Sequence, residues 1–172
     1  MRWWPTTASR VANERSAGSP RASRGQEHRG PAPPEQAFEL FTAGLSRWWP
    51  LKTHSCAGVD ALRVDIEPRV GGQVLEQARN GTQAPWGTVL AWDPPRLFAM
   101  TWHPAAGPAE AIRLEVSFAA EGNSSCRVEV VHSGWEARGP RAEELRENYD
   151  KGWVRVLAAY SSVIGRATGE ST

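Results

Sequence analysis

The hydrophobic residues of this chain recur with two different periods, which divide it into extended and helical parts. Between Ala61 and Ser133, apolar residues alternate with polar ones, a pattern typical of strands with one buried face. Six such runs follow one another, separated by turn residues such as Gly71-Gly72, Asn80-Gly81 and Gly122-Asn123. The pattern predicts consecutive strands of an antiparallel sheet.

Two of these runs form the centre of the predicted sheet, at residues 84–103. Asp93-Pro94-Pro95 joins them, and this is a turn signal because aspartate bonds to nearby backbone and proline presets φ. Trp86, Trp92 and Trp102 lie near the start, the bend and the end of the resulting hairpin.

Helical spacing appears on both sides of the strand region. Behind Pro33-Pro34, apolar residues from Ala37 to Leu45 form one face of a short helix. After Gly139-Pro140, apolar residues from Leu145 to Ile164 fall at steps of three or four and predict an amphipathic helix of about seven turns.

Together these elements predict an α+β domain in which the long helix covers the apolar face of the sheet. A curved antiparallel β-sheet would wrap around the long C-terminal α-helix, with short N-terminal helices in front. Such a sheet leaves a cavity beneath the helix, and the tryptophans, nine in the whole chain, are placed to line it.

Periodicity also suggests the limits of the domain. Residues 1–30 show no apolar period and are predicted to be a disordered N-terminal tail, or alternatively a basic arm that binds a partner. Residues 31–166 are predicted to form the domain, and residues 167–172 a flexible C-terminal tail. It stays open whether residues 1–30 are a genuine part of the protein.

Composition excludes several classes of function. The formal net charge of +1 does not favour nucleic-acid binding, and two cysteines without metal-ligand spacing argue against a zinc site or a disulfide framework. We expect neither a metal ion nor another cofactor. No apolar run approaches the length of a membrane span or a signal peptide. We therefore expect a cytoplasmic protein without membrane insertion.

An ordered set of short motifs runs along the chain: Pro34–Thr42, Trp48-Trp49, Gly71-Gly72, Glu76, Gly87–Val89, Trp92–Leu97, Thr101-Trp102, His132–Trp135 and Gly152-Trp153. This set resembles the SRPBCC (START-like) superfamily, and within it the group named for activators of the heat shock protein 90 ATPase. The likeness covers residues 31–165.

The resemblance implies a helix-grip fold with an internal hydrophobic pocket. It also implies a strand before the first helix, whereas residues 24–30 contain no β-branched or aromatic residue. Either this edge strand is degraded, or it pairs through its backbone alone.

Two titratable residues are candidates for the pocket. Glu76 lies on an alternating strand and would be an acid or a base if it faced inward, or a solvated strand residue if it faced outward. His132 shares the apolar face of its strand and would be either a proton shuttle or a core histidine with one partner. His103 is expected near the cavity mouth. No spacing ties either histidine to a serine or a carboxylate, so no catalytic residue is predicted.

The predicted ligand-contact residues are mostly tryptophans, whose alternative role is plain core packing. The complete set is Trp48, Trp49, Glu76, Trp86, Trp102, His132, Trp135 and Trp153.

Three functions are compatible with these features, and the sequence favours binding over catalysis. The first is binding of a small hydrophobic or aromatic ligand between sheet and C-terminal helix. The second, which the resemblance implies, is an enzyme of the polyketide cyclase or hydrolase-like type. The third is regulation of a chaperone ATPase through protein binding, which ranks last because residues 1–34 are too short and polar to form the separate N-terminal domain of the chaperone activators.

Overall fold

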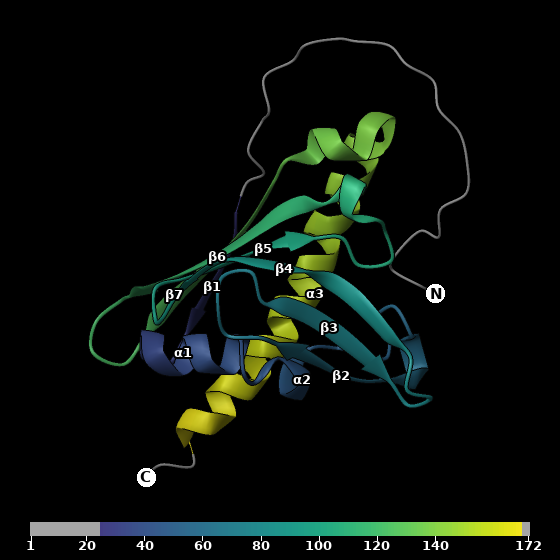
Figure 1. Cartoon of the computed structure of the whole chain (residues 1–172). Helices are drawn as coiled ribbons and strands as arrows, with labels where there is room; N and C mark the ends of the chain where they lie inside the picture. The colour runs from purple at the N-terminus through teal and green to yellow at the C-terminus, as the bar shows by residue number, and fades with distance from the viewer. Residues whose placement is uncertain (1–24, 170–172) are drawn as a thin grey trace.

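A seven-stranded antiparallel sheet curls around one long helix in the computed structural model, which describes residues 25–169 (Figure 1). The strands pair in the order β1-β7-β6-β5-β4-β3-β2. Their bounds are β1 (Gln26–Gly30), β2 (Ala61–Ile66), β3 (Gln73–Ala78), β4 (Gln83–Asp93), β5 (Leu97–Trp102), β6 (Ile112–Ala120) and β7 (Cys126–Ser133). The predicted helix-grip fold is confirmed.

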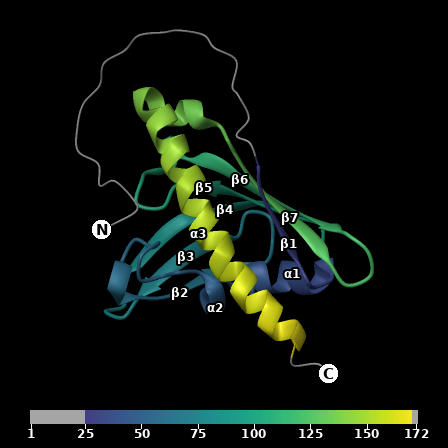
Figure 2. The same ribbon diagram turned by 180° about the vertical axis from the view of Figure 1, so that it is seen from behind.

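The long helix α3 (Ala142–Gly169) crosses one face of the sheet, as Figure 2 shows most directly. Its apolar stripe is buried against the sheet, and the Tyr160 hydroxyl donates a 2.8 Å hydrogen bond to the carbonyl oxygen of Ala37. Ala37 belongs to α1 (Pro34–Phe41), which is followed by the single turn α2 (Leu45–Trp48). Three short 3₁₀ helices complete the chain: η1 (Gly58–Asp60), η2 (Pro108–Glu110) and η3 (Trp135–Arg141).

The predicted tryptophan hairpin is formed by β4 and β5, with its bend at Asp93–Arg96. The strands come very close together near Gly87, where a Cβ atom would lie 1.7 Å from the carbonyl oxygen of Thr101. Only glycine fits there without moving a strand. This close approach places the preceding Trp86 fully inside the domain.

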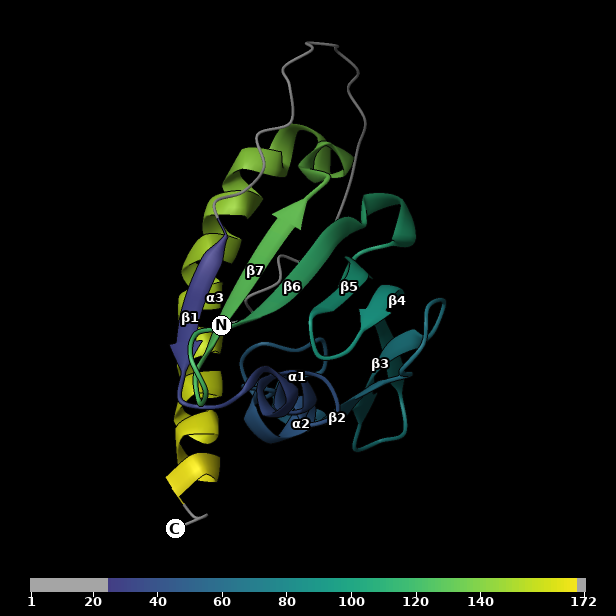
Figure 3. The same ribbon diagram turned by 90° about the vertical axis from the view of Figure 1, so that its left-hand side faces the viewer.

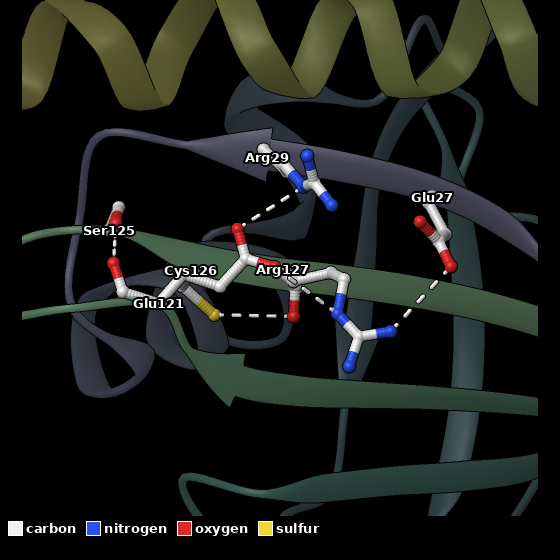
Figure 4. A network of polar contacts seen from close by, with 6 residues as sticks. All are labelled: Glu27, Arg29, Glu121, Ser125, Cys126 and Arg127. Carbon is white, nitrogen blue, oxygen red and sulfur yellow. Dashed lines mark hydrogen bonds and ion pairs between the residues drawn. The ribbon is translucent and has the colours of Figure 1, made fainter.

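Strand β1 corrects the expected tail over residues 1–30, because residues 26–30 pair with β7. Figure 3 shows β1 running beside α3 at this edge of the sheet. Ion pairs supplement the backbone pairing: Arg127 lies 3.6 Å from Glu27 and 3.4 Å from Glu121, and Arg29 lies 3.2 Å from Glu121 (Figure 4). Such half-exposed pairs contribute little stability, so the backbone ladder chiefly holds the strand. Residues 1–24 lie outside the described residues.

Two smaller expectations also differ from the structure. Helix α3 continues to Gly169, so residues 167–169 are helical rather than part of a C-terminal tail, and residues 170–172 are not described. Leu62 is 45% exposed although it alternates with polar residues, because the pairing register of β2 shifts between Ala61 and Arg63. Among the helices of the described residues, none combines the length and apolar character needed to cross a bilayer.

Candidate ligand-binding site

Four tryptophans from four separate elements converge between α3 and the sheet. Trp49 follows α2, Trp86 lies on β4, Trp102 ends β5 and Trp153 lies on α3. The ring centroid of Trp49 lies 5.1 Å from that of Trp86, 5.9 Å from Trp102 and 5.5 Å from Trp153. Most of these pairs meet edge to face, the arrangement that aromatic quadrupoles favour. Trp49 is therefore the centre of the cluster.

The four rings enclose a small apolar cavity. Its volume open to the centre of a water molecule is about 10 Å³, close to the minimum for a single water. The remaining lining is also apolar, and comprises Phe41, Leu45, Ile66, Val74, Phe98, Met100 and Leu114. The only N–H groups of this lining belong to tryptophan indoles, and those of Trp49, Trp86 and Trp153 already donate to His54, Glu76 and His132.

The segment 50–60 follows Trp49 and contacts it, because Nε1 of Trp49 donates a hydrogen bond to the carbonyl oxygen of His54. It is held by Glu76, whose carboxylate accepts hydrogen bonds from the backbone N–H groups of Cys56 and Ala57, both at 2.7 Å. The same carboxylate accepts a 2.8 Å bond from Nε1 of Trp86. Glu76 is 1% exposed, so it faces inward, and its oxygens are occupied by donors that bind the segment to the sheet. This geometry suits a structural latch.

Cys56 lies beside Glu76 within this latch. Burial, followed by the negative charge of Glu76, raises the pKa of the Cys56 thiol to about 12. The thiol therefore stays protonated at neutral pH and is a poor nucleophile.

His132, near the end of β7, is enclosed by aromatic rings. Its centroid lies 5.4–5.8 Å from those of Trp102, Trp135, Tyr149 and Trp153. Burial, with a smaller contribution from the positive charge of Arg138, lowers the pKa of His132 to about 3. The imidazole is therefore neutral at physiological pH, which makes it unsuitable as a general acid.

The predicted contact residues separate into two groups. Trp49, Trp86, Trp102 and Trp153 line the cavity, whereas Trp48, Trp135, Glu76 and His132 do not. Trp48 packs on Phe41 and Tyr160 and donates a 2.8 Å bond from Nε1 to the carbonyl oxygen of Leu40. Glu76 and His132 lie behind the tryptophans. Glu76 contacts Trp86, and His132 contacts Trp102 and Trp153.

One buried cation was not anticipated from the sequence. The side chain of Arg138, in η3, is only 6% exposed, and its Nη2 donates a 3.4 Å hydrogen bond to the carbonyl oxygen of Trp102. Arg138 belongs to a non-periodic segment rich in charged residues, so no local pattern marks it as buried. Within residues 25–169, no group of three or more His, Cys, Asp or Glu side chains is placed to hold a metal ion.

Comparison with known structures identifies similar folds over most of the chain. An anthrahydroquino-γ-pyrone synthase, Txn09, has 29% identity and a TM-score of 0.59, and the match covers 86% of this chain and 100% of that one. A self-sacrificing resistance protein, CalC from Micromonospora echinospora, has 23% identity and a TM-score of 0.60 over 84% of this chain and 95% of its own. Protein MLL2253 from Mesorhizobium loti has 18% identity and a TM-score of 0.61 over 83% of this chain and 98% of its own.

A comparison with curated protein sequences finds no match. The family described as Activator of Hsp90 ATPase homolog 1-like protein, in contrast, matches residues 31–163, which is most of the chain. Together with the helix-grip architecture, this match shows that the chain belongs to the Activator of Hsp90 ATPase homolog 1-like protein family.

Proposed function

We propose that the domain binds a small hydrophobic molecule with an aromatic ring system between α3 and the sheet. The observation that carries this proposal is the convergence of four tryptophans on one apolar cavity. Tryptophan offers a large rigid surface for flat aromatic ligands, and apolar cavities with few polar groups are the usual sites for such molecules.

Binding requires the cavity to expand. Its volume of about 10 Å³ is far below the roughly 300 Å³ or more that a drug-sized ligand occupies. Trp49 and the segment 50–60 are the natural moving part, because they belong neither to the sheet nor to α3. The hydrogen bonds that join this segment to the sheet include the Glu76 latch and the bond from the backbone N–H of Arg79 to the carbonyl oxygen of Asp60.

The name of one similar protein supports a more specific ligand class. Txn09 is named an anthrahydroquino-γ-pyrone synthase, and this name describes an enzyme that makes a fused polycyclic aromatic. Its identity of 29% spans nearly the whole of both chains. We therefore propose a polycyclic aromatic as the ligand of the present domain.

Quenching of tryptophan fluorescence by 2-(hydroxymethyl)anthraquinone tests this proposal. We expect saturable binding, with an association rate constant below about 10⁵ M⁻¹s⁻¹ because the segment must open first. Trp49→Phe should weaken binding about 3- to 10-fold through lost ring contact. Trp92→Phe is the matched control, since Trp92 packs on Phe38 and Phe98 and does not line the cavity. No saturable quenching by this probe and a panel of related ring systems, or equal effects of the two variants, would contradict the proposal.

A second candidate function is catalysis on such a molecule, which the name of Txn09 favours. It would need Glu76 or His132 to reach a reacting atom, yet neither lines the cavity, and the low pKa of His132 makes it a weak base. Mass spectrometry of anthraquinone-type polyketide precursors incubated with the protein tests this function. Turnover that is lost in both Glu76→Gln and His132→Gln would establish it over simple binding.

A further inference from the structure

Three buried side chains next to Trp102 each carry a nitrogen without a hydrogen-bond partner among the described residues. These atoms are Nδ1 of His103, Nδ1 of His132 and Nε of Arg138. The exposed fractions are 5% for His103, 4% for His132 and 6% for the side chain of Arg138. Buried polar atoms are nearly always satisfied in folded proteins, so these three nitrogens require an explanation.

The topology brings these residues together. Strands β5 and β7 both pair antiparallel with β6, so they run in the same direction. Their last residues therefore lie at the same end of the sheet, beside the start of β6. Trp102 and His103 lie at the end of β5, His132 lies near the end of β7, and Arg138 is in η3 directly beyond it.

The unpartnered nitrogen of His132 is a hydrogen-bond donor. Its Nε2 accepts a 2.7 Å bond from Nε1 of Trp153, so this nitrogen carries no proton. Because the lowered pKa keeps the ring neutral, the single ring proton must be on Nδ1. Leaving such a donor buried and unpaired is unfavourable, because it has lost its hydrogen bond to water.

Arg138 needs a partner more strongly than His132 does, because its buried guanidinium group carries a positive charge. Its closest carboxylate, that of Glu110, is 3.8 Å away and 42% exposed, and its bond to the carbonyl oxygen of Trp102 is long. A buried guanidinium without close compensation is destabilising, so this site is suited to receive a negative charge from elsewhere.

We propose that His132 and Arg138, here called the oxyanion pocket, bind an anionic oxygen of the ligand, either a carboxylate or an ionised phenol. Trp102 connects the two sites: its ring lines the tryptophan cavity and packs on His132, and its carbonyl oxygen accepts the bond from Arg138. A ligand whose ring system lies in the cavity would place the oxygen beyond Trp102, against the Nε–H of Arg138 and the Nδ1–H of His132. This inference rests on the proposed function and adds the charge of the ligand to it.

Three probes with one ring system test the charge preference: anthraquinone-2-carboxylate, 2-hydroxyanthraquinone and the neutral 2-(hydroxymethyl)anthraquinone. Affinities are measured by calorimetry at a mildly alkaline pH, where the phenol is ionised. We expect at least one anionic probe to bind about 10-fold or more tightly than the neutral probe, since hydrogen bonds to charged groups are stronger than those between neutral groups. Which anion binds better distinguishes a carboxylate site from a phenolate site.

Two variants of η3 form a matched pair for this experiment. Arg138→Met should abolish the preference for the anionic probe, whereas Arg141→Met should retain it, because Arg141 is half-exposed and pairs with Glu144 at 3.7 Å. The melting temperature of ligand-free Arg138→Met should be no lower than that of the wild type, since the variant removes a buried charge whose closest carboxylate is 3.8 Å away and exposed.

Each outcome decides the proposal. Equal affinities of wild type for charged and neutral probes would overturn the oxyanion pocket and leave the proposed function intact, with water as the partner of the buried donors. Absence of binding by all three probes would overturn the proposed function and this inference with it. If Arg138→Met does not fold, Glu110→Gln decides: removing this exposed carboxylate should increase the preference for the anion, and an unchanged preference would refute the proposal.

Discussion

The buried imidazole of His132 is expected to make the domain less stable below neutral pH. Its pKa is lowered from 6.5 to about 3, chiefly by burial. Between these values the unfolded chain binds a proton at this site and the folded chain does not, so the free energy of unfolding falls as the pH falls. The slope is about 1.4 kcal/mol per pH unit, or about 4–5 kcal/mol across the whole window. Above pH 6.5 both states are neutral and the effect vanishes.

The variant that isolates this effect is His132→Gln. The amide oxygen of glutamine can accept the bond from Nε1 of Trp153, and the side chain does not titrate. Comparison with a variant is necessary because burial also lowers the pKa of His28 and His54 and raises that of Asp150. The two histidines add to the loss of stability in acid, and Asp150 opposes it. These contributions cancel in the difference between the two proteins.

Urea unfolding at pH 7.5 and pH 5 provides the measurement. On acidification, the wild type should lose roughly 2 kcal/mol more than His132→Gln, which is the slope acting between pH 6.5 and pH 5. Parallel pH dependences of the two proteins would refute the reasoning. They would mean that the folded domain accepts a proton on His132, and therefore that the ring is reached by solvent.

Three further substitutions test the packing around the cavity. Gly87→Ala should lower the free energy of unfolding by about 3 kcal/mol or more, because its Cβ would lie 1.7 Å from the carbonyl oxygen of Thr101. Gly107→Ala is the control: its Cβ would meet no atom within 4 Å, so the free energy of unfolding should change by less than about 0.5 kcal/mol. Glu76→Gln should cost about 2–4 kcal/mol, because its amide group would face an N–H donor, and it should speed the exchange of the Cys56 and Ala57 amide hydrogens. Trp153→Ala should cost about 3–5 kcal/mol in chemical denaturation, because this side chain is 1% exposed.

The strands of this domain could be predicted wherever one face of the strand is buried and the other is exposed to solvent. Strand β7 alternates strictly between buried and half-buried residues, and its period of two is visible in the sequence. Strand β1 has no such signal, because it is held by its backbone ladder and by half-exposed ion pairs to β7. A strand that buries little side-chain surface leaves little trace in the order of its residues.

The tryptophan cavity was only partly predictable, for a geometric reason. Trp86 and Trp102 lie on strands, where alternation indicates the inward face. Trp48 and Trp49 are adjacent at the end of the single turn α2, where neither period applies. There the tertiary packing decides: Trp48 packs against Phe41 and Tyr160, and Trp49 packs against the other cavity tryptophans.

The oxyanion pocket was not predictable from the sequence, because it depends on what is missing around each group. Arginine and histidine near strand ends are common, and most find partners or water. Arg138 differs because its charged side chain is only 6% exposed, and yet its closest carboxylate, that of Glu110, is 3.8 Å away. What distinguishes His132 is that Trp153 occupies its acceptor nitrogen and so fixes an unpaired donor on the other. Both facts arise from long-range packing of β7, η3 and α3 around Trp102. A core selected for stability alone would replace such groups with apolar ones, which is the physical reason for expecting them to serve a ligand.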